Sequence, residues 1–317
     1  MRLASYSLLL MIVAVSALAA YPDHPIRLVV PVAAGGGNDI VARMLAQKLT
    51  DAWGQAVVVD NRPGAATAIG AEIVAKAIPD GHTIMLTSVS FAINAGMRKD
   101  LPFDAVRDFA TITQVARVPQ IMVVNPAVPA TTLAEFIALA KAKPGQINYA
   151  SAGTGSSTHL AMEIFMDMTA IKLNHVPYKG TAPGLTDVIA GHVQATFDAI
   201  PPTLPLIRSG RVRALAIGGP QRFPTLPEVP TLAQAGVPNY TFQSWFGILA
   251  PARTPDAIVR TLNRELVRII RLPETNKVFI ELGIEPLGTS PEEFAKYLRA
   301  EIARWSEVMR AHNIRGE

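Results

Sequence analysis

Cysteine is absent from this chain of 317 residues. Its absence excludes disulfide bonds, thiolate catalysis and cysteine-ligated metal sites. Aromatic residues make up only 6% of the chain, and the formal net charge of +4 includes no block of lysine or arginine. A nucleic-acid interface needs clustered basic charge and usually stacking aromatics, so we expect no nucleic-acid partner. The mild positive excess suits a small anionic ligand without establishing one.

Long hydrophobic runs are also scarce, apart from one at the N-terminus. Arg2 precedes the apolar segment Leu8–Ala19, which is too short to span a bilayer and ends in the small-residue pattern Ala17-Leu18-Ala19. This arrangement predicts a secretory signal peptide at residues 1–19, cleaved after Ala19; the alternative is an uncleaved membrane anchor. No later segment has eighteen uninterrupted apolar residues, so we expect the mature chain to be soluble.

Strand-like and helix-like segments alternate along the rest of the chain. Pro25–Val32 is rich in β-forming residues, Asp39–Gly54 carries apolar residues at helical spacing, and similar pairs follow. This alternation predicts βαβ units, and the nearly all-apolar strands predict sheets that are covered on both faces. We therefore expect an α/β fold with two domains, each a mostly parallel sheet flanked by helices.

The order of the segments predicts that the first domain is discontinuous. A proline-rich loop after Phe223 leads back to a strand-like run and to two long helices, roughly Pro255–Arg271 and Pro291–His312. The predicted division is 20–104 plus 225–317 for domain 1 and 105–224 for domain 2, with a ligand cleft between them.

The stretch Ile147–Met168 passes from a strand to a helix through glycines and small hydroxyl residues. The first N–H groups of a helix have no intrahelical partner, and the helix dipole adds partial positive charge there. Glycines let the backbone approach a ligand and hydroxyls add donors, so this turn is predicted to bind an anion. The candidate ligand-binding residues are Ser151, Gly153, Thr154, Gly155, Ser156, Ser157 and His159.

Other kinds of site fit this turn less well. A Walker loop needs a lysine, and a nucleophile elbow needs Gly-x-Ser-x-Gly, which Gly155-Ser156-Ser157-Thr158 does not provide. A dinucleotide fingerprint needs a third glycine where this chain has Thr158. The remaining alternative is structural, with the hydroxyls only capping the helix.

A second turn of the same design lies in Val29–Leu45, where an apolar strand, three glycines and a helix start follow one another. Two helix N-termini that face one another across a cleft could hold one ligand with one or two anionic groups. We expect Asp39 to cap its helix, since its carboxylate would repel an anion. The candidate ligand-binding residues here are Ala34, Gly35, Gly36, Gly37, Asn38 and Asp39.

No catalytic constellation accompanies these turns, so we expect no enzyme. No two of the six histidines stand at i, i+3 or i+4, and therefore no metal site or cofactor is predicted. His159 is a candidate for the cleft, with a packing or capping role as its alternative. Asp198 ends an apolar strand and is a candidate acceptor for a ligand amino or hydroxyl group, with a structural role as its alternative.

Six segments of the chain occur in an order that resembles a known protein family. They are YPDHPIRLVVPVAAGGGND, DNRPGAATAIGAEIVAKAIPDGHT, INYASAGTGSSTHLAMEIF, HVPYKGTAPGLTDVIAGHV, PTLPEVPTLAQAGVP and SWFGILAPARTP. From about Tyr21 to His312, the chain closely resembles the extracytoplasmic solute-binding proteins of tripartite tricarboxylate transporters, the Bug family. The run His175–Gly180 together with the upstream turn is highly specific for this family.

The resemblance implies a periplasmic two-domain Venus flytrap that closes on a small carboxylate and delivers it to membrane transporter subunits. In the family, two strand-to-helix loops hold one carboxylate through backbone and hydroxyl groups, partly with ordered waters. These loops correspond here to Ala34–Asp39 and Ser151–His159, and Thr87-Ser88 and Asp198 also tend to face the cleft. We expect a monomer.

This chain departs from the family pattern at two places. The family often has glycines and an asparagine where the chain has Ala66-Thr67-Ala68, and commonly a phenylalanine at Val32. Ligand size therefore does not carry over, and dicarboxylates, tricarboxylates, acidic amino acids and aromatic acids all stay open. Two other functions stay open as well: a ligand-sensing module that signals to a receptor, and a secreted serine hydrolase using Ser156 or Ser157 with His159.

Overall fold

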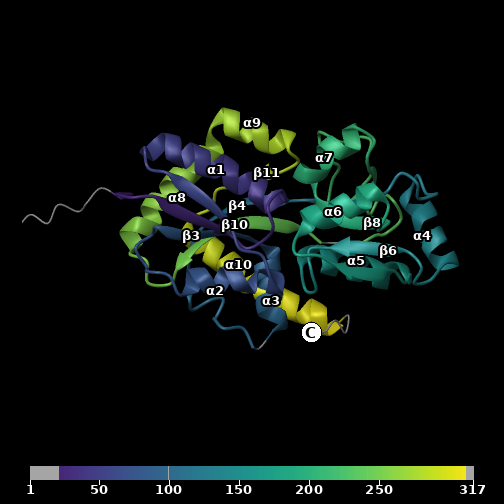
Figure 1. Ribbon diagram of the computed structural model, residues 1–317, viewed down its shortest axis with the longest axis horizontal. Helices are drawn as coiled ribbons and strands as arrows, with labels where there is room; N and C mark the ends of the chain where they lie inside the picture. Colours follow the sequence, from purple (N-terminus) through teal and green to yellow (C-terminus); the bar gives the residue numbers. More distant parts are fainter. Residues whose placement is uncertain (1–20, 99, 241, 312–317) are drawn as a thin grey trace, which may run out of the picture.

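The computed structural model describes residues 21–98, 100–240 and 242–311. It consists of two β-sheets, each flanked by helices and each forming one lobe (Figure 1). The predicted signal peptide and its cleavage after Ala19 lie outside the described residues. Within those residues, no helix combines the length and the apolar character that a membrane span requires.

The first sheet has six strands in the order β11-β4-β10-β3-β1-β2. Its strands are β1 (Ile26–Val30), β2 (Val57–Asn61), β3 (Thr83–Ser88), β4 (Phe109–Val118), β10 (Ser244–Pro251) and β11 (Glu285–Pro286). β1 pairs parallel with β2 and β3, whereas β10 runs antiparallel between β3 and β4. Every residue of β10 is buried, as expected for a central strand in a sheet covered on both faces.

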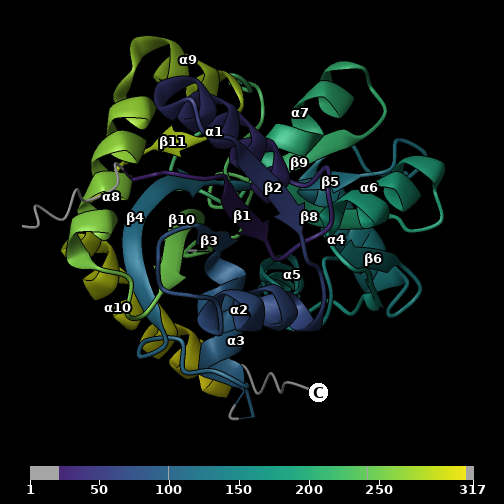
Figure 2. The same ribbon diagram turned by 60° about the vertical axis from the view of Figure 1, so that its left-hand side comes forward.

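Helices cover both faces of this sheet. One face carries α1 (Gly37–Trp53), α8 (Asp256–Arg271) and α9 (Pro273–Glu281), and the other carries η1 (Ala65–Thr67), α2 (Ala68–Ala75), α3 (Val89–Met97) and α10 (Pro291–Ala311). In α1, Val41, Leu45 and Leu49 recur at helical spacing and are fully buried in one cluster with β1. α8 and α10 both pack along β4 (Figure 2).

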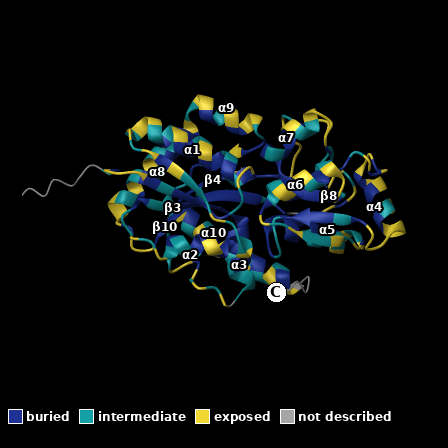
Figure 3. Ribbon diagram, viewed as in Figure 1, coloured by how far each residue is buried: buried dark blue, intermediate teal, exposed yellow. Residues whose placement is uncertain are grey.

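The second sheet has five strands in the order β7-β6-β8-β5-β9. Its strands are β5 (Gln120–Val124), β6 (Asn148–Ser151), β7 (Asn174–Pro177), β8 (Ala195–Ala199) and β9 (Arg213–Ile217). The helices around it are α4 (Leu133–Ala142), α5 (Ser157–Thr169), α6 (Thr181–Ala190) and α7 (Ile200–Arg208). In both lobes the central strands are buried while the outward sides of the helices are exposed (Figure 3).

The predicted α/β class with two sheet-and-helix units is confirmed, but both sheets are mixed rather than mostly parallel. The difference arises because β10 and β5 enter antiparallel to their neighbours. β4 and α9 were not predicted. The predicted domain boundary stood at residue 105, but the chain passes from the first sheet to the second between Val118 and Gln120. Strand pairing therefore places β4 in the first sheet.

The topology places several helix starts in the space between the sheets. α1, α3, α5 and α7 each follow the carboxyl end of a strand, namely β1, β3, β6 and β8. Crevices outside the carboxyl ends of strands are the usual binding sites of open α/β sheets.

Candidate functional site

Two strand-to-helix turns, one from each sheet, face one another between the lobes. Gly36 caps the start of α1 and Ser156 caps the start of α5. A Cβ added to Gly36 would meet Thr181 Oγ1 at 3.0 Å, and one added to Gly37 would meet Ala199 Cβ at 3.0 Å. The two lobes approach so closely here that a Cβ at either glycine would force its neighbour to shift by a few tenths of an ångström.

A hydrogen bond joins the lobes directly. The backbone N–H of Ser157, the first residue of α5, donates to Ser90 Oγ in α3 at 3.0 Å. Gly155 adds a second contact: it has a φ of +75°, and a Cβ at this position would overlap the side chain of Met97. The structure therefore shows the lobes in contact around the paired turns.

Asp39 holds the α1 turn in shape rather than facing the space between the lobes. Its Oδ2 accepts from the Gly35 N–H and from Arg43 Nε, each at 2.9 Å, and its Oδ1 accepts from Asn61 Nδ2 at 3.0 Å. Burial alone would raise the pKa of this carboxyl, but the hydrogen bonds from Arg43, Gly35 and Asn61 outweigh it and lower the pKa. The carboxylate is thus engaged within its own lobe, where it holds the loop before α1 and does not cap the first turn of the helix as the sequence predicts.

Two histidines shape the α5 turn. Ser151 Oγ lies 2.6 Å from His175 Nε2 and accepts from the Gly153 N–H at 3.1 Å. His159 Nδ1 accepts from the Gly155 N–H at 3.1 Å, and burial lowers the pKa of this imidazole to about 4. His159 is therefore neutral at physiological pH, with the nitrogen that faces the turn already occupied.

The two helix starts differ in the donors that they leave for a ligand. In α5, the N–H of His159 donates to Ser156 Oγ at 3.3 Å and that of Ser157 donates across the lobes. In α1, Gly36 has no side chain to cap the helix, so the N–H groups of the first turn keep their hydrogen-bonding capacity. The positive end of α1 is therefore the stronger anion site of the two.

A small pocket of about 40 Å³ lies between the paired turns. This inner pocket has room for a water molecule or a carboxylate-sized group. It is lined from both sheets, by Val32, Gly36, Gly37, Asn38, Ser88, Ser90, Gln120, Ala152, Ser157, Thr158, Thr181, Asp198, Ala199, Ser244 and Phe246.

Three buried polar atoms in the lining of the inner pocket have no hydrogen-bond partner among the described residues. They are Asn38 Nδ2, Gln120 Oε1 and Asp198 Oδ2. Most buried polar atoms in proteins are paired, because an unpaired one costs free energy. Their convergence on one pocket indicates a site built to bind a polar group.

Asp198 is the only one of these three that titrates. Burial raises the pKa of its carboxyl to about 7, although the Ala199 N–H, which donates to Oδ1 at 2.7 Å, partly opposes the shift. A carboxyl with this pKa can carry a proton near neutral pH and donate it to an anion.

A larger cavity of about 250 Å³ adjoins the inner pocket and shares Val32, Ser90 and Ala152 with it. Two cations, Arg98 and Lys179, line this outer cavity. Arg98 pairs with Asp100 at 2.8 Å, whereas Lys179 forms no ion pair within the described part of the chain. The complete lining is Pro31, Val32, Pro63, Gly64, Ala65, Ala66, Thr67, Ser90, Asn94, Met97, Arg98, Ala152, Gly153, Thr154, Ser156, Tyr178, Lys179 and Gly180.

One wall of the outer cavity has an unusual backbone. Ala65, Ala66 and Thr67 have φ values of 45°, 48° and 88°, in the left-handed region that favours glycine. Such a residue costs about 1–2 kcal/mol relative to the right-handed form. Asn94 Nδ2 holds the segment by donating to the carbonyl oxygens of Ala65 and Ala66, each at 3.1 Å.

Comparison with known proteins decides the family. The family model described as "Tripartite tricarboxylate transporter family receptor" matches residues 41–314. The chain belongs to this family. The resemblance seen in the sequence is thereby confirmed.

Two relatives extend the match. This chain is 36% identical over 293 residues to the "UPF0065 protein in tcbD-tcbE intergenic region" of Pseudomonas sp. (strain P51). The match covers 92% of this chain and 87% of that protein. It is also 36% identical over 292 residues to Protein BugT of Bordetella pertussis, covering 92% and 90%.

Solved structures agree in fold. BugD, a periplasmic binding protein, superposes with a TM-score of 0.90 at 31% identity, covering 94% of this chain and all of that one. "R. palustris Rpa4515 with adipate" reaches a TM-score of 0.91 at 36% identity, covering 93% and 99%. MatC from Rhodopseudomonas palustris with bound malate reaches 0.86 at 29%, covering 91% and 99%. This family member therefore has the two-domain fold of periplasmic solute-binding proteins.

The structure divides the predicted site residues into two groups. Those that line a cavity are Gly36, Gly37, Asn38, Ser88, Ser157 and Asp198 at the inner pocket and Gly153, Thr154 and Ser156 at the outer cavity. Those outside both linings are Ala34, Gly35, Asp39, Ser151, Gly155 and His159. Asp39, Ser151 and His159 shape the turns instead, and direct ligand contact stays a prediction for every residue of the site.

Several lining residues were not predicted from the sequence. Ser90, Gln120 and Thr181 complete the inner pocket, and Lys179 reaches the outer cavity. The sequence carried a partial signal for Lys179, which lies in the family-specific run His175–Gly180. Gln120 stands in an apolar strand and carried no signal.

Proposed function

We propose that this protein is a periplasmic receptor that captures a small carboxylate between its two domains and delivers it to tripartite tricarboxylate transporter subunits in the membrane. The proposed domains follow the predicted division at 20–104 plus 225–317 and 105–224, except that the pairing of β4 (Phe109–Val118) with β10 assigns β4 to the first domain, after removal of a signal peptide at 1–19. The family membership supports the class of protein, and the inner pocket supports the class of ligand.

The observation that carries the proposal is the composition of the inner pocket. The start of α1 and the amide of Asn38 supply donors from one lobe, and the hydroxyl of Ser157 comes from the other. A carboxylate accepts such bonds strongly, and charge-assisted hydrogen bonds contribute about 1.5–3 kcal/mol each. Since both lobes contribute, the full set of bonds forms only when the cleft is closed, so a ligand favours closure.

The adjoining outer cavity supports a dicarboxylate as the ligand. A short aliphatic acid with one carboxylate in the inner pocket would extend toward Lys179 and Arg98, which line the outer cavity. A second carboxylate would there meet positive charge. Adipate and malate, both dicarboxylates, are the ligands named for two similar structures.

The serine hydrolase alternative gains no support from the geometry. His159 Nδ1 accepts from the Gly155 N–H, and Ser156 Oγ accepts from the backbone N–H of His159 rather than facing its ring. A nucleophile–base pair needs a hydrogen bond between the serine hydroxyl and a free ring nitrogen. The sensing alternative shares the same cleft and differs only in its partner; capture of transporter subunits from membranes in the presence of ligand would favour delivery.

The test is a calorimetric titration of the protein lacking residues 1–19 with a panel of mono-, di- and tricarboxylates and their uncharged amides. We expect a dicarboxylate to bind, the amides to be inert, and Asn38→Ala to weaken binding. A ligand at 100 times its dissociation constant would also stabilise the fold by about 2.7 kcal/mol in thermal unfolding. Turnover of the bound acid, or binding that Asn38→Ala leaves unchanged, would contradict the proposal.

A further inference from the structure

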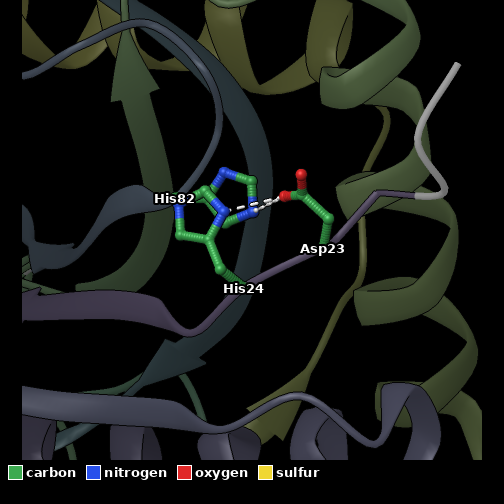
Figure 4. Close-up of side chains that lie close together, drawn as sticks. All are labelled: Asp23, His24 and His82. Atoms are coloured by element: carbon green, nitrogen blue, oxygen red, sulfur yellow. Dashed lines mark hydrogen bonds and ion pairs between the residues drawn. The ribbon is translucent and has the colours of Figure 1, made fainter.

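Three side chains of the kind that bind metal ions lie together outside the cleft. Asp23 and His24 precede β1, and His82 precedes β3 (Figure 4). β1 and β3 are parallel neighbours, so the segments before them meet at one edge of the sheet. The cleft lies at the opposite edge, outside the carboxyl ends of the same strands. None of the three residues lines either cavity.

The distances within this cluster suit a single small ion. Asp23 Oδ1 lies 2.8 Å from His24 Nδ1 and 3.2 Å from His82 Nε2, and the three ligand atoms all lie within 4.8 Å of one another. Zinc ligands lie about 2.0–2.2 Å from the ion, which puts tetrahedral ligand atoms about 3.3 Å apart. The ligand atoms are thus already close enough for one ion, although the stacked His24 ring has to turn to reach it.

His82 supplies an independent observation. His82 is only 9% exposed, yet neither nitrogen of its ring has a hydrogen-bond partner among the described residues. Nε2 points toward Asp23 Oδ1, 3.2 Å away, as Figure 4 shows. A buried imidazole without hydrogen bonds is costly, and a metal ion at Nε2 would remove that cost.

The surroundings of His82 resemble the outer shell of a metal site. Asp80 Oδ1 lies 3.6 Å from His82 Nδ1 and accepts from the His82 backbone N–H at 2.9 Å. At 3.6 Å the carboxylate does not hydrogen-bond to Nδ1, but it places negative charge beside the second ring nitrogen, where metal-bound histidines commonly have a carboxylate. The ring of Tyr21 packs edge-on against His82 with centroids 5.0 Å apart, so the imidazole is held in place.

His24 has the freedom that coordination requires. Its ring stacks on His82 with centroids 3.5 Å apart and planes 11° apart, and its side chain is 56% exposed. An imidazole holds a metal ion in its own ring plane, so two parallel rings cannot share one ion. The exposed His24 ring must therefore tilt away from the stack, while His82 stays fixed.

We propose that Asp23, His24 and His82 form a binding site for one divalent ion of the late first-row metals, with Zn²⁺ as its representative. Two imidazole nitrogens and one carboxylate suit Zn²⁺, Ni²⁺ and Cu²⁺, whereas Mg²⁺ and Ca²⁺ prefer sites made of oxygen alone. The bound ion connects the segment before β1 to the loop before β3 and so stabilises the first sheet. The sequence did not predict this site because His24 precedes β1 and His82 precedes β3, so the two histidines are far apart along the chain.

The experiment is a calorimetric titration of Zn²⁺ into the protein without residues 1–19, without a histidine tag and after treatment with a chelator. We expect one saturable site per chain, and an affinity that falls roughly tenfold or more in His24→Ala and in Asp23→Asn. His192→Ala is the matched control. His192 is exposed and lies 3.3 Å from one carboxylate, that of Asp187, but it belongs to no group of three metal-binding side chains among the described residues. It should bind Zn²⁺ like the unchanged protein.

A second measurement separates the site from nonspecific binding. Zn²⁺ should raise the thermal unfolding midpoint of the unchanged protein and of His192→Ala but not that of His24→Ala, and Mg²⁺ should do neither. The proposal is overturned if Zn²⁺ does not bind, or if His24→Ala and Asp23→Asn bind it like the unchanged protein. Both substitutions lie outside the cleft, so carboxylate binding by the variants provides a check that they are folded.

Discussion

The backbone N–H of Ser157, at the start of α5, donates to the hydroxyl of Ser90 in α3 at 3.0 Å. Ser157 belongs to the second lobe and Ser90 to the first, and both residues line the inner pocket. In an open form the Ser157 N–H would reach water instead. In the arrangement of this structure the Ser90 hydroxyl takes the place of that water, so the buried N–H keeps a partner.

Removing this hydroxyl should weaken ligand binding. In Ser90→Ala the Ser157 N–H stays buried without its partner when the lobes close, which costs about 1–3 kcal/mol. That cost corresponds to roughly a 5- to 150-fold loss of carboxylate affinity, measurable by calorimetry. Ser90→Thr keeps a hydroxyl and is the matched control. An affinity unchanged in Ser90→Ala would show that the bond contributes nothing to closure.

Asp198 should make the stability of the protein fall as pH rises. Its folded pKa of about 7 is raised by burial from the ordinary value of 3.8, so the folded chain keeps a proton that the unfolded chain releases. The contribution is complete below about pH 4 and is lost as pH rises through 7. Asp198→Asn cannot ionise, so its unfolding free energy relative to the unchanged protein should increase over this range. Urea unfolding at a series of pH values measures the difference; a constant difference would refute the raised pKa.

His159 should act in the opposite direction over nearly the same range. Burial lowers its folded pKa from 6.5 to about 4, so the unfolded chain binds the proton first as pH falls. Its contribution is present above pH 6.5 and is lost as pH falls toward 4. Relative to His159→Gln, the unchanged protein should lose stability across this window in the same urea experiments. Since the two groups oppose each other, only the single variants separate them.

Glycine at position 66 should stabilise the fold. Ala66 has a left-handed φ of 48°, which glycine adopts without the clash of a Cβ. The relief of about 1–2 kcal/mol is partly offset by the larger entropy of glycine in the unfolded chain, leaving a gain of up to about 1 kcal/mol. Ala303→Gly, at an exposed position inside α10, is the control and should destabilise by about 1 kcal/mol. Equal effects of the two substitutions would mean that the conformation of Ala66 is not strained.

Lys179 should distinguish dicarboxylates from monocarboxylates. It lines the outer cavity and has no ion-pair partner within the described residues, whereas Arg98 is paired with Asp100. Lys179→Gln should lower the affinity for a dicarboxylate several-fold and leave that for a monocarboxylate of equal length unchanged. Its effect should diminish at high salt, because the residue is exposed and its charge is screened. If both acids lose affinity equally, Lys179 contributes to the cavity wall and not to recognition of a second charge.

Much of the local structure follows from short-range patterns in the sequence. The spacing of the apolar residues Ile40, Met44, Leu45, Leu49 and Trp53 predicts α1, and the glycines and hydroxyls before α1 and α5 predict helix starts that suit an anion. The C-terminal helices predicted at Pro255–Arg271 and Pro291–His312 appear as α8 and α10, with His312 outside the described residues. These features depend on contacts within a few residues, where periodicity and capping preferences act.

Only the tertiary structure decided how these pieces form a site. Ser90, Gln120 and Asp198 lie on three different elements and meet in one pocket because the lobes pack together. His24 and His82 meet because β1 and β3 pair in parallel. Gly155 leaves room for the side chain of Met97, which reaches it from the other lobe. The sequence by itself thus determined most of the elements, the family resemblance and the position of the two glycine-rich turns that are predicted to bind an anion. The partners of each side chain depended on which apolar surfaces, distant in the sequence, are buried against one another. That packing is cooperative and involves the whole chain.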